Sequence, residues 1–285
     1  MRKILFLCCL ALLPGILTAK KYTAAGEPGQ ARTKYTTAGK PEQSQSSSRY
    51  AGREQARTKY KVRSFAWERI EVTKRLDLTP DAEAQAIVQP YKASVDSVMM
   101  PPLGLSRRAM SGKRPESLLG NWAADVLVET STATGMERAD MGLMNVGGLR
   151  NSMPEGIVRR GDIIQISPFE NKVVVVEMKG SDLLELMRNI ASVHGEAVSH
   201  SVRLEITRDG QLVSATIGGE PIRQDRIYRV ATIDYLAEGN DKMTALKKKQ
   251  KQYDMGMLAR EAFMEYILKT QVIDSSLEGR IVVKE

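Results

Sequence analysis

Between residues 80 and 130 the apolar positions recur at helical spacing in two stretches. The first follows Thr79-Pro80-Asp81, which places a capping hydroxyl, a proline and an acid where a helix begins. Pro90 lies inside this stretch and should kink or split the helix, because proline removes a backbone donor. The second stretch follows Glu116-Ser117 and predicts a helix with one apolar stripe. That stripe consists of Leu118, Leu119, Trp122, Ala123, Val126 and Leu127.

Shorter apolar stretches predict strands farther along the chain. They lie at residues 67–72, 141–144, 162–166, 173–176, 202–207, 213–217, 227–233 and 281–283. The unbroken run Val173–Val176 is typical of a strand that is buried on both faces. Turns are predicted at Asp209-Gly210 and Gly218-Gly219. Two more helices are expected, one capped by Ser181-Asp182 and running to Ile190, and one over residues 257–268.

The alternation of helices with frequent hairpins indicates the fold class. A doubly wound fold would need strands and helices in strict alternation around a parallel sheet. We therefore predict one α+β domain over residues 64–285, with mixed and partly antiparallel sheets. A hydrophobic content of 42% is ordinary for a protein with a core of this kind.

The first 19 residues have the pattern of a secretory signal peptide. Arg2 and Lys3 precede the apolar stretch Ile4–Leu17, and small residues up to Ala19 offer a cleavage site. We therefore expect an exported protein, either periplasmic or extracellular. An uncleaved anchor is the alternative. Lipidation at the two cysteines of this segment is disfavoured, because bulky residues precede them.

Both cysteines of the chain, Cys8 and Cys9, lie in this segment. The mature protein is therefore expected to have neither a disulfide nor thiol chemistry.

Residues 20–63 are polar and repetitive. The sequence Gln30–Tyr35 recurs as Gln55–Tyr60, and apolar residues are too few to offset the entropy of ordering. We predict a disordered basic tail. The chain's net charge of +8 is interpreted as a solvated surface plus this tail. Contact of the tail with a wall polymer or a partner is an alternative, and nucleic-acid binding is a weaker one because no motif for it is present.

Three loops could carry chemistry. In Asn145–Arg150, paired glycines let backbone amides approach an anion, and the arginine can grip a phosphate or carboxylate. In Ser167–Asn171, an aromatic ring beside an amide suits a flat heterocycle. In Asp234–Asp241, a second aromatic ring accompanies carboxylates that suit sugar hydroxyls. Taken singly, each loop also fits a purely structural role, as a tight turn, a core phenylalanine and an acidic turn.

Taken together, the three loops match a family pattern. The stretch Leu118–Asp125, the order of the loops, and Gly161-Asp162 between the first two loops also match it. Over about residues 76–285 the chain resembles the C-terminal domain of the 5'-nucleotidase and UDP-sugar hydrolase family. The resemblance implies a layered α/β sandwich that binds a nucleotide or nucleoside.

The resemblance also implies roles for particular residues. Phe169 and Tyr235 would sandwich the base, and Asn171 would bond to its edge. Asp241 would bind the ribose hydroxyls, while Arg150 and Asn145 would face the phosphate. Lys113 stands where the family usually has a further arginine. The substrate-binding residues implied are thus Lys113, Asn145, Arg150, Phe169, Asn171, Tyr235 and Asp241.

The chain departs from the family pattern at several positions. Val146 replaces the first of three glycines, Tyr235 replaces a phenylalanine, and Asn240 replaces a glycine. Lys113 keeps the charge of the usual arginine but loses its bidentate geometry. Nucleotide binding is still expected, whereas these changes bear on its specificity.

In this family an N-terminal metallophosphoesterase domain carries out hydrolysis with two metal ions. The chain has only two histidines, His194 and His200, which we interpret as surface residues rather than ligands. We therefore expect no catalytic residue, no metal ligand and no cofactor in this chain, and divalent metals on a partner. Whether the chain takes part in catalysis depends on that partner.

Two functions of different classes follow. In the first, the chain is the substrate-binding subunit of a 5'-nucleotidase-type hydrolase in nucleotide catabolism, paired with a separately encoded metallophosphoesterase. In the second, it is a non-catalytic ligand-binding or surface-interaction module that kept the fold.

Overall fold

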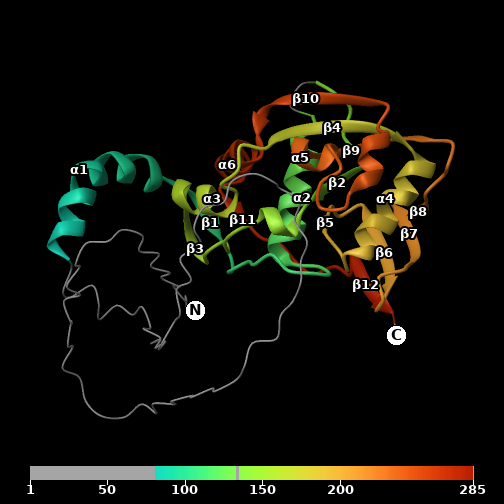
Figure 1. Ribbon diagram of the computed structural model, residues 1–285, viewed down its shortest axis with the longest axis horizontal. Coiled ribbons are helices and arrows are strands. Elements are labelled where there is room, and N and C mark those ends of the chain that lie inside the picture. The colour runs from blue at the N-terminus through green and yellow to red at the C-terminus, as the bar shows by residue number, and fades with distance from the viewer. Residues whose placement is uncertain (1–80, 133–134, 285) are drawn as a thin grey trace, which may run out of the picture. The chain divides into compact units, whose positions relative to one another are not determined.

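The computed structural model describes residues 81–132 and 135–284 (Figure 1). The chain divides between Ala82 and Glu83 into two units, and the fold below is that of the second, Glu83–Glu285. The signal peptide, the basic tail and the strand predicted at residues 67–72 lie outside the described residues, so they stay predictions.

The described part contains helices and strands in mixed order. The helices are α1 (Ala82–Met99), α2 (Leu118–Thr130), α3 (Arg160–Ile166), α4 (Gly180–Ser192), α5 (Asp234–Ala237) and α6 (Ala259–Thr270). Short 3-10 turns, η2 and η3, lie at Val146–Gly148 and Thr244–Lys248. The first strands are β1 (Pro102–Ser106), β2 (Met141–Met144), β3 (Gly156–Arg159), β4 (Lys172–Lys179), β5 (Ala197–Val198) and β6 (Val202–Thr207). The others are β7 (Leu212–Ile217), β8 (Glu220–Pro221), β9 (Ile227–Ile233), β10 (Lys251–Leu258), β11 (Val272–Ile273) and β12 (Ile281–Lys284).

A five-stranded mixed sheet with the order β10-β4-β9-β2-β5 forms the centre of the domain. Strand β9 pairs antiparallel with β4 and parallel with β2, and β5 pairs antiparallel with β2. Every side chain from Val173 to Val176 is buried, which confirms a strand covered on both faces. The α+β class with mixed sheets is thereby confirmed.

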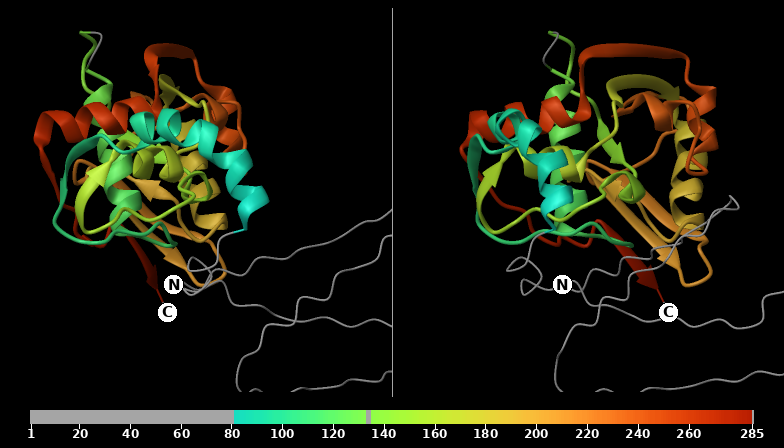
Figure 2. Two further views of the ribbon diagram at one scale, coloured as in Figure 1. Left: turned by 90° about the vertical axis from the view of Figure 1, so that its left-hand side faces the viewer. Right: turned by 60° about the vertical axis from the view of Figure 1, so that its left-hand side comes forward.

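Two smaller sheets complete the layers. Helix α4 contacts the central sheet through β4 and β9 and the four-stranded sheet β12-β6-β7-β8 through β6 and β7, so it lies between them (Figure 2). Helix α6 packs against α2 and against β1 and β11 of the three-stranded sheet β11-β1-β3. None of the helices in the described part is long and apolar enough to cross a membrane.

The strand predicted at residues 162–166 is wrong, because this segment belongs to helix α3. Asp162 accepts a hydrogen bond from the backbone N–H of Arg159 at 2.7 Å, which caps the first turn. Ile163 and Ile166 are both buried, and their spacing of three residues fits one face of a helix. The short apolar run did not distinguish a helix from a strand.

The predicted capping of α4 by Ser181-Asp182 is also wrong. The helix begins at Gly180, and its N-cap residue Lys179 makes no side-chain capping bond. Instead, the N–H of Gly180 donates to the carbonyl of Arg226 at 2.8 Å, and that of Ser181 donates to Gln224 at 3.2 Å. The β8–β9 connection therefore satisfies this helix end, which no local pattern could show.

Helix α1 is continuous through Pro90 and bends along its length (Figure 1). The predicted kink is therefore present without a break. The apolar side chains keep helical spacing, but no residue of α1 is buried, and Tyr91 is 68% exposed. Two contacts hold the C-terminal end of α1. Gly161 lies close to Met99, and the guanidinium of Arg159 donates to the carbonyl of Met100 at 2.7 Å.

Candidate functional site

The three loops singled out in the sequence meet at one edge of the central sheet. Strands β2 and β9 run parallel, so the loops 145–150 and 234–241 leave the sheet on the same side. Strand β4 is antiparallel to β9, with Val173 opposite Ile233, so the loop 167–171 enters β4 at that side. Strand β5 is antiparallel to β2, which brings Glu196 there too. We call this set of loops, residues 145–150, 167–171, 194–196 and 234–241, the loop edge.

A carboxylate network joins two of these loops. The Nδ2 atom of Asn145 donates to Oδ2 of Asp241 at 2.6 Å, and the hydroxyl of Tyr235 donates to Oδ1 at 3.0 Å. The pKa of the Tyr235 phenol is raised, mainly by this hydrogen bond to Asp241 and further by the negative charge of Asp241. Asp241 is held with φ 50°, in the left-handed region. Three of the predicted residues are thus joined directly, with Asp241 bonded to both Asn145 and Tyr235.

The two predicted aromatic rings remain accessible at this edge. Phe169 is 46% exposed and Tyr235 is 40% exposed, although most large apolar side chains of the domain are buried. Tyr235 belongs to the single helical turn α5, directly after β9, and Phe169 lies just before β4. Exposed aromatic faces at the ends of paired strands can receive a planar ligand.

The loop that carries Phe169 is fastened from behind by α6. Arg260 donates to the carbonyls of Pro168 and Phe169, both at 3.4 Å, and pairs with Glu170 at 3.2 Å. The carbonyl of Asn171 accepts the N–H of Ala259 at 2.8 Å. The backbone of Asn171 is therefore fixed by α6, and its side chain is half-buried at the loop edge.

Arg150 is exposed at the end of the glycine turn. One of its guanidinium nitrogens, Nη1, donates to the carbonyl of Gly147 at 3.2 Å. Its backbone N–H donates to the carbonyl of Ile166 at 2.8 Å, and so ties the glycine turn to the segment leading to Phe169. The guanidinium keeps most of its donors for other partners.

Lys113 is exposed and follows Gly112, which packs near Leu149 and Val146 of the glycine turn. Its neighbour Arg114, rather than Lys113, forms hydrogen bonds with the loop edge. Arg114 donates through Nε to the carbonyl of Gly195 at 2.7 Å and through Nη2 to the carboxylate of Glu196.

Glu196 is a buried carboxylate that the sequence did not single out. Its side chain is 1% exposed, and Oε2 accepts the N–H of Val146 at 2.5 Å. Burial raises the pKa of Glu196, while the Val146 amide and Arg114 act in the opposite direction; the charge of Asp241 raises it further. The sequence feature that could have identified Glu196 is its position as a charged residue between Gly195 and the buried strand β5.

Part of the family pattern lies away from the loop edge. Asn121 and Asp125, on the Gly-Asn helix α2, both contact the buried Arg280. Arg280 Nη1 donates to the carbonyl of Asn121 at 3.2 Å, and Nη1 and Nη2 donate to the Asp125 carboxylate at 2.9 and 2.7 Å. These two motif residues therefore hold the fold rather than line the loop edge.

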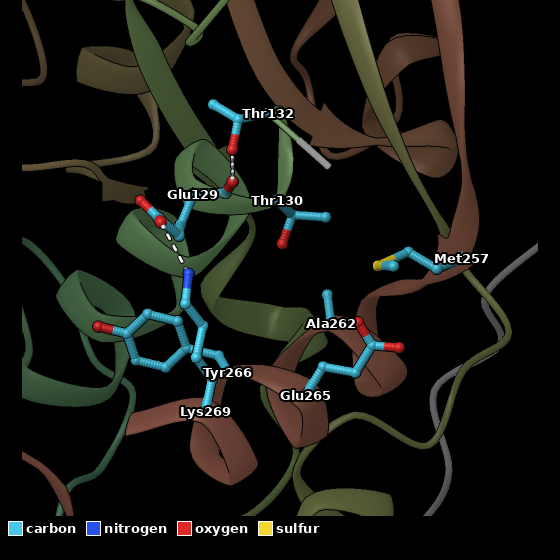
Figure 3. A pocket seen from close by; sticks show the side chains of 8 residues that line it. All are labelled: Glu129, Thr130, Thr132, Met257, Ala262, Glu265, Tyr266 and Lys269. Atoms are coloured by element: carbon cyan, nitrogen blue, oxygen red, sulfur yellow. Dashed lines mark hydrogen bonds and ion pairs between the residues drawn. The ribbon is translucent and has the colours of Figure 1, made fainter. Parts of the chain in front are cut away.

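A pocket of about 270 Å³ lies elsewhere, between the end of α2 and α6 (Figure 3). In it Lys269 reaches toward Glu129 at 3.5 Å with Tyr266 beside them, and Glu265 and Met257 lie on the other side. It contains none of the residues predicted to bind a ligand. The loop edge carries exposed rings, whereas this pocket has a mixed lining in which Glu129 and Lys269 are already paired with each other.

Within residues 81–132 and 135–284 no group of histidine, cysteine or acidic residues could hold a metal ion. Both histidines are exposed, as interpreted from the sequence. His200 bonds to Glu278 at 2.7 Å, and His194 adopts φ 60° in the turn before Glu196.

Comparison with known proteins agrees with this arrangement. The model of the 5'-nucleotidase C-terminal domain family matches residues 94–248, which is more than half of the chain. Protein UshA of Escherichia coli is 25% identical over 214 residues, which cover 72% of this chain and 38% of that protein. Protein UshA of Yersinia enterocolitica is 31% identical over 160 residues, covering 53% of this chain and 29% of that protein.

Solved structures give the same result. The 5'-nucleotidase precursor from Thermus thermophilus superposes with a TM-score of 0.64 at 28% identity, over 70% of this chain and 43% of that one. The NAD nucleotidase of Haemophilus influenzae shares the fold, with a TM-score of 0.55 at 19% identity, over 76% of this chain and 46% of that one. This chain thus spans less than half the length of these proteins.

Proposed function

Because this chain belongs to the family of 5'-nucleotidase C-terminal domains, we propose that its loop edge binds a nucleotide or nucleoside. The observation that carries the proposal is that two exposed rings, Phe169 and Tyr235, stand at the same edge of the sheet as the Asn145–Asp241–Tyr235 network. Base, sugar and phosphate each need a different chemistry, and the loop edge offers all three.

The base would stack between Phe169 and Tyr235. Stacking on an aromatic side chain contributes about 1–3 kcal/mol per base. Arg260 supports this role, because its bonds to the carbonyls at 168 and 169 restrain the Phe169 backbone. The side-chain amide of Asn171 would supply donors and an acceptor for the edge of the base.

The sugar and the phosphate would lie toward the glycine turn. Each oxygen of Asp241 accepts one internal hydrogen bond and keeps a lone pair for a ribose hydroxyl. Arg150, Asn145 and Lys113 would face the phosphate; the exposed guanidinium of Arg150 is the strongest of these donors.

We further propose that hydrolysis requires a metallophosphoesterase supplied by another chain. Two-metal sites stabilise the attacking and leaving oxygens of a phosphate ester, and the described residues offer no ligand cluster for such ions. The chain would then be an exported substrate-binding subunit in nucleotide catabolism. Export is proposed from the charged and apolar pattern of residues 1–19.

Isothermal titration with adenosine, AMP and UDP-glucose tests the binding site. The mature chain should bind at least one of these ligands, and Phe169→Ala should weaken that binding by about tenfold or more. Leu277→Ala is the matched control, because Leu277 is a 60% exposed apolar side chain outside the loop edge. Equal affinities in the wild type and Phe169→Ala would refute the base clamp.

The partner is tested separately. A candidate metallophosphoesterase from the same organism would be mixed with this chain, and AMP hydrolysis and co-elution would be measured. We expect a gain in activity that Phe169→Ala reduces. Neither a gain in activity nor co-elution would contradict the split enzyme while leaving the binding site intact.

A further inference from the structure

Three apolar side chains form a row across the outer face of the three-stranded sheet β11-β1-β3. Leu105 of β1 stands opposite Ile157 of β3 and opposite Val272 of β11, so all three project from the same face. They are between 44% and 54% exposed, while the other face of the sheet packs against α6. A sheet face that meets solvent normally carries polar side chains, so this row indicates a surface that another element covers. We call these three residues the sheet row.

Helix α1 carries a second uncovered apolar surface, a stripe of five side chains at helical spacing. The stripe consists of Ile87, Val88, Tyr91, Val95 and Val98, which are between 47% and 68% exposed. No residue of α1 is buried, and no other helix or strand of the described residues packs along it. Most helices in proteins are stabilised by packing of such a stripe, so α1 lacks its covering surface within one copy of the chain.

The connection between α1 and β1 is short and held in place. Only Met100 and Pro101 separate the two elements, and Pro102 opens β1, so two consecutive prolines restrict the backbone. The guanidinium of Arg159 donates to the carbonyl of Met100 at 2.7 Å, and the N–H of Arg160 donates to that of Pro101 at 2.9 Å. With these bonds in place α1 leaves the sheet row of its own chain uncovered.

The charges beside the two apolar surfaces are of opposite sign. Arg107 and Arg159 each lie two residues after a member of the sheet row, so strand alternation places them on the same face. Helix α1 carries two acids, Glu83 and Asp96, and one base, Lys92, which gives it a net charge of −1. Contact of α1 with the sheet row brings opposite charges together, whereas contact of α1 with a second α1 brings like charges together.

We infer that two copies of this chain form a dimer in which α1 of each copy packs on the sheet row of the other. A helix on a sheet face is a stable layer pairing, and reciprocal exchange of one element gives a closed two-fold dimer. Two helix–sheet contacts of this size cover roughly 1,000 Å², about the lower limit for a specific interface. The inference is independent of the proposed ligand, because it uses neither the loop edge nor its residues.

Sedimentation velocity of the mature chain at increasing concentration tests the dimer. The wild type should sediment as a dimer. Val95→Glu in the α1 stripe and Leu105→Glu in the sheet row should each weaken the dimer by about tenfold or more, because each would bury an unpaired charge. Val213→Glu is the matched control, since Val213 is a 53% exposed valine on β7, outside both surfaces, and it should leave the dimer unchanged. Circular dichroism of each variant checks that it is folded.

Disulfide trapping identifies the surfaces without relying on destabilising variants. Both natural cysteines lie in the predicted signal peptide, so an introduced cysteine is expected to be the only one in the mature chain. A tagged Leu105→Cys chain is mixed with an untagged chain carrying Tyr91→Cys, Val95→Cys or Val98→Cys, and oxidised.

At least one of these mixtures should give a mixed disulfide between the two chains, whereas Leu105→Cys with Val213→Cys should give none. A wild type that stays monomeric would overturn the inference. So would a dimer that survives both glutamate substitutions, or one that gives no mixed disulfide between α1 and Leu105→Cys.

Discussion

Two polar clusters of this domain use the same residue types in opposite ways. Around Arg280, which is 2% exposed, Asp125 and Glu278 accept charged hydrogen bonds and Val198 and Asn121 add carbonyls. Around Asp241, at the loop edge, an exposed carboxylate is shared by Asn145 and Tyr235, and the rings of Tyr235 and Phe169 are exposed at the same edge of the sheet. The Arg280 guanidinium is buried, whereas Asp241 and the two rings of the loop edge are open to solvent.

The difference separates motif residues that hold the fold from those that can meet a ligand. Asn121 and Asp125 belong to the first group. Glu116, just before the motif, supports them, because its carboxylate accepts the N–H groups of Glu278 and Arg280 and a bond from the Asn121 amide. Glu116 therefore ties the start of α2 to the segment before β12. The family's sequence pattern contains residues of both groups, and only their burial and their hydrogen-bond partners in the structure distinguish them.

The largest effect should come from breaking the Arg280 cluster. Arg280→Ala removes a guanidinium that donates five hydrogen bonds, to Glu278, Asn121, Asp125 and Val198. Removing one partner of a buried ion pair costs about 3–5 kcal/mol, so we expect the free energy of unfolding in urea to fall by that amount. The adenosine affinity of the protein that remains folded should stay within about twofold.

Arg188→Ala is the control for that experiment, since Arg188 is exposed on α4 and its loss should change stability by less than about 0.5 kcal/mol. A fall in adenosine affinity without a fall in stability in Arg280→Ala would contradict the division between the two clusters.

The sequence predicted the elements that have a regular apolar period and missed those that do not. Strands β2, β6 and β9 begin and end where the apolar pattern indicated. Strand β10 was missed because it lies at a sheet edge, where mostly exposed side chains remove the alternation. Strands β1 and β3 were missed too, since their few apolar residues stand beside glycine or proline.

The loops of the candidate site were predictable, but their supports were not. Phe169, Tyr235 and Asp241 stand in loops with a recognisable composition. Glu196 reaches Val146 only because β5 pairs with β2, and Arg260 reaches the Phe169 loop only because α6 follows β10. Such contacts depend on strand pairing between distant segments, which no local pattern encodes.

A smaller effect should separate stacking from hydrogen bonding at Tyr235. Tyr235→Ala removes a ring and should weaken adenosine binding by about tenfold. Tyr235→Phe keeps the ring and removes only the bond to Asp241, so we expect a change of less than about threefold. Titration calorimetry on the two variants measures both. A loss in Tyr235→Phe as large as in Tyr235→Ala would mean that the hydroxyl, rather than the ring, holds the ligand.

The smallest effect concerns the proton of Tyr235. Its pKa is raised above 10.0 by Asp241, so the folded state holds this proton more tightly than the unfolded state does. The resulting stabilisation is present below pH 10 and is lost as the pH rises through the folded-state pKa. Tyrosinate absorbance of the wild type minus that of Tyr235→Phe should show the raised pKa, and Asp241→Asn should move it back toward 10.0. An unchanged titration in Asp241→Asn would contradict the hydrogen bond.

The central claim is that a base stacks on Phe169, and fluorine NMR of fluorophenylalanine-labelled protein tests it most directly. Phe169 is 46% exposed at the loop edge, whereas Phe263 is fully buried in the core and serves as an internal reference. The resonance lost in Phe169→Leu identifies the site. Saturating adenosine should shift that resonance through the ring current of the base and leave Phe263 unchanged. Binding detected by calorimetry with no shift of the Phe169 resonance would contradict the claim.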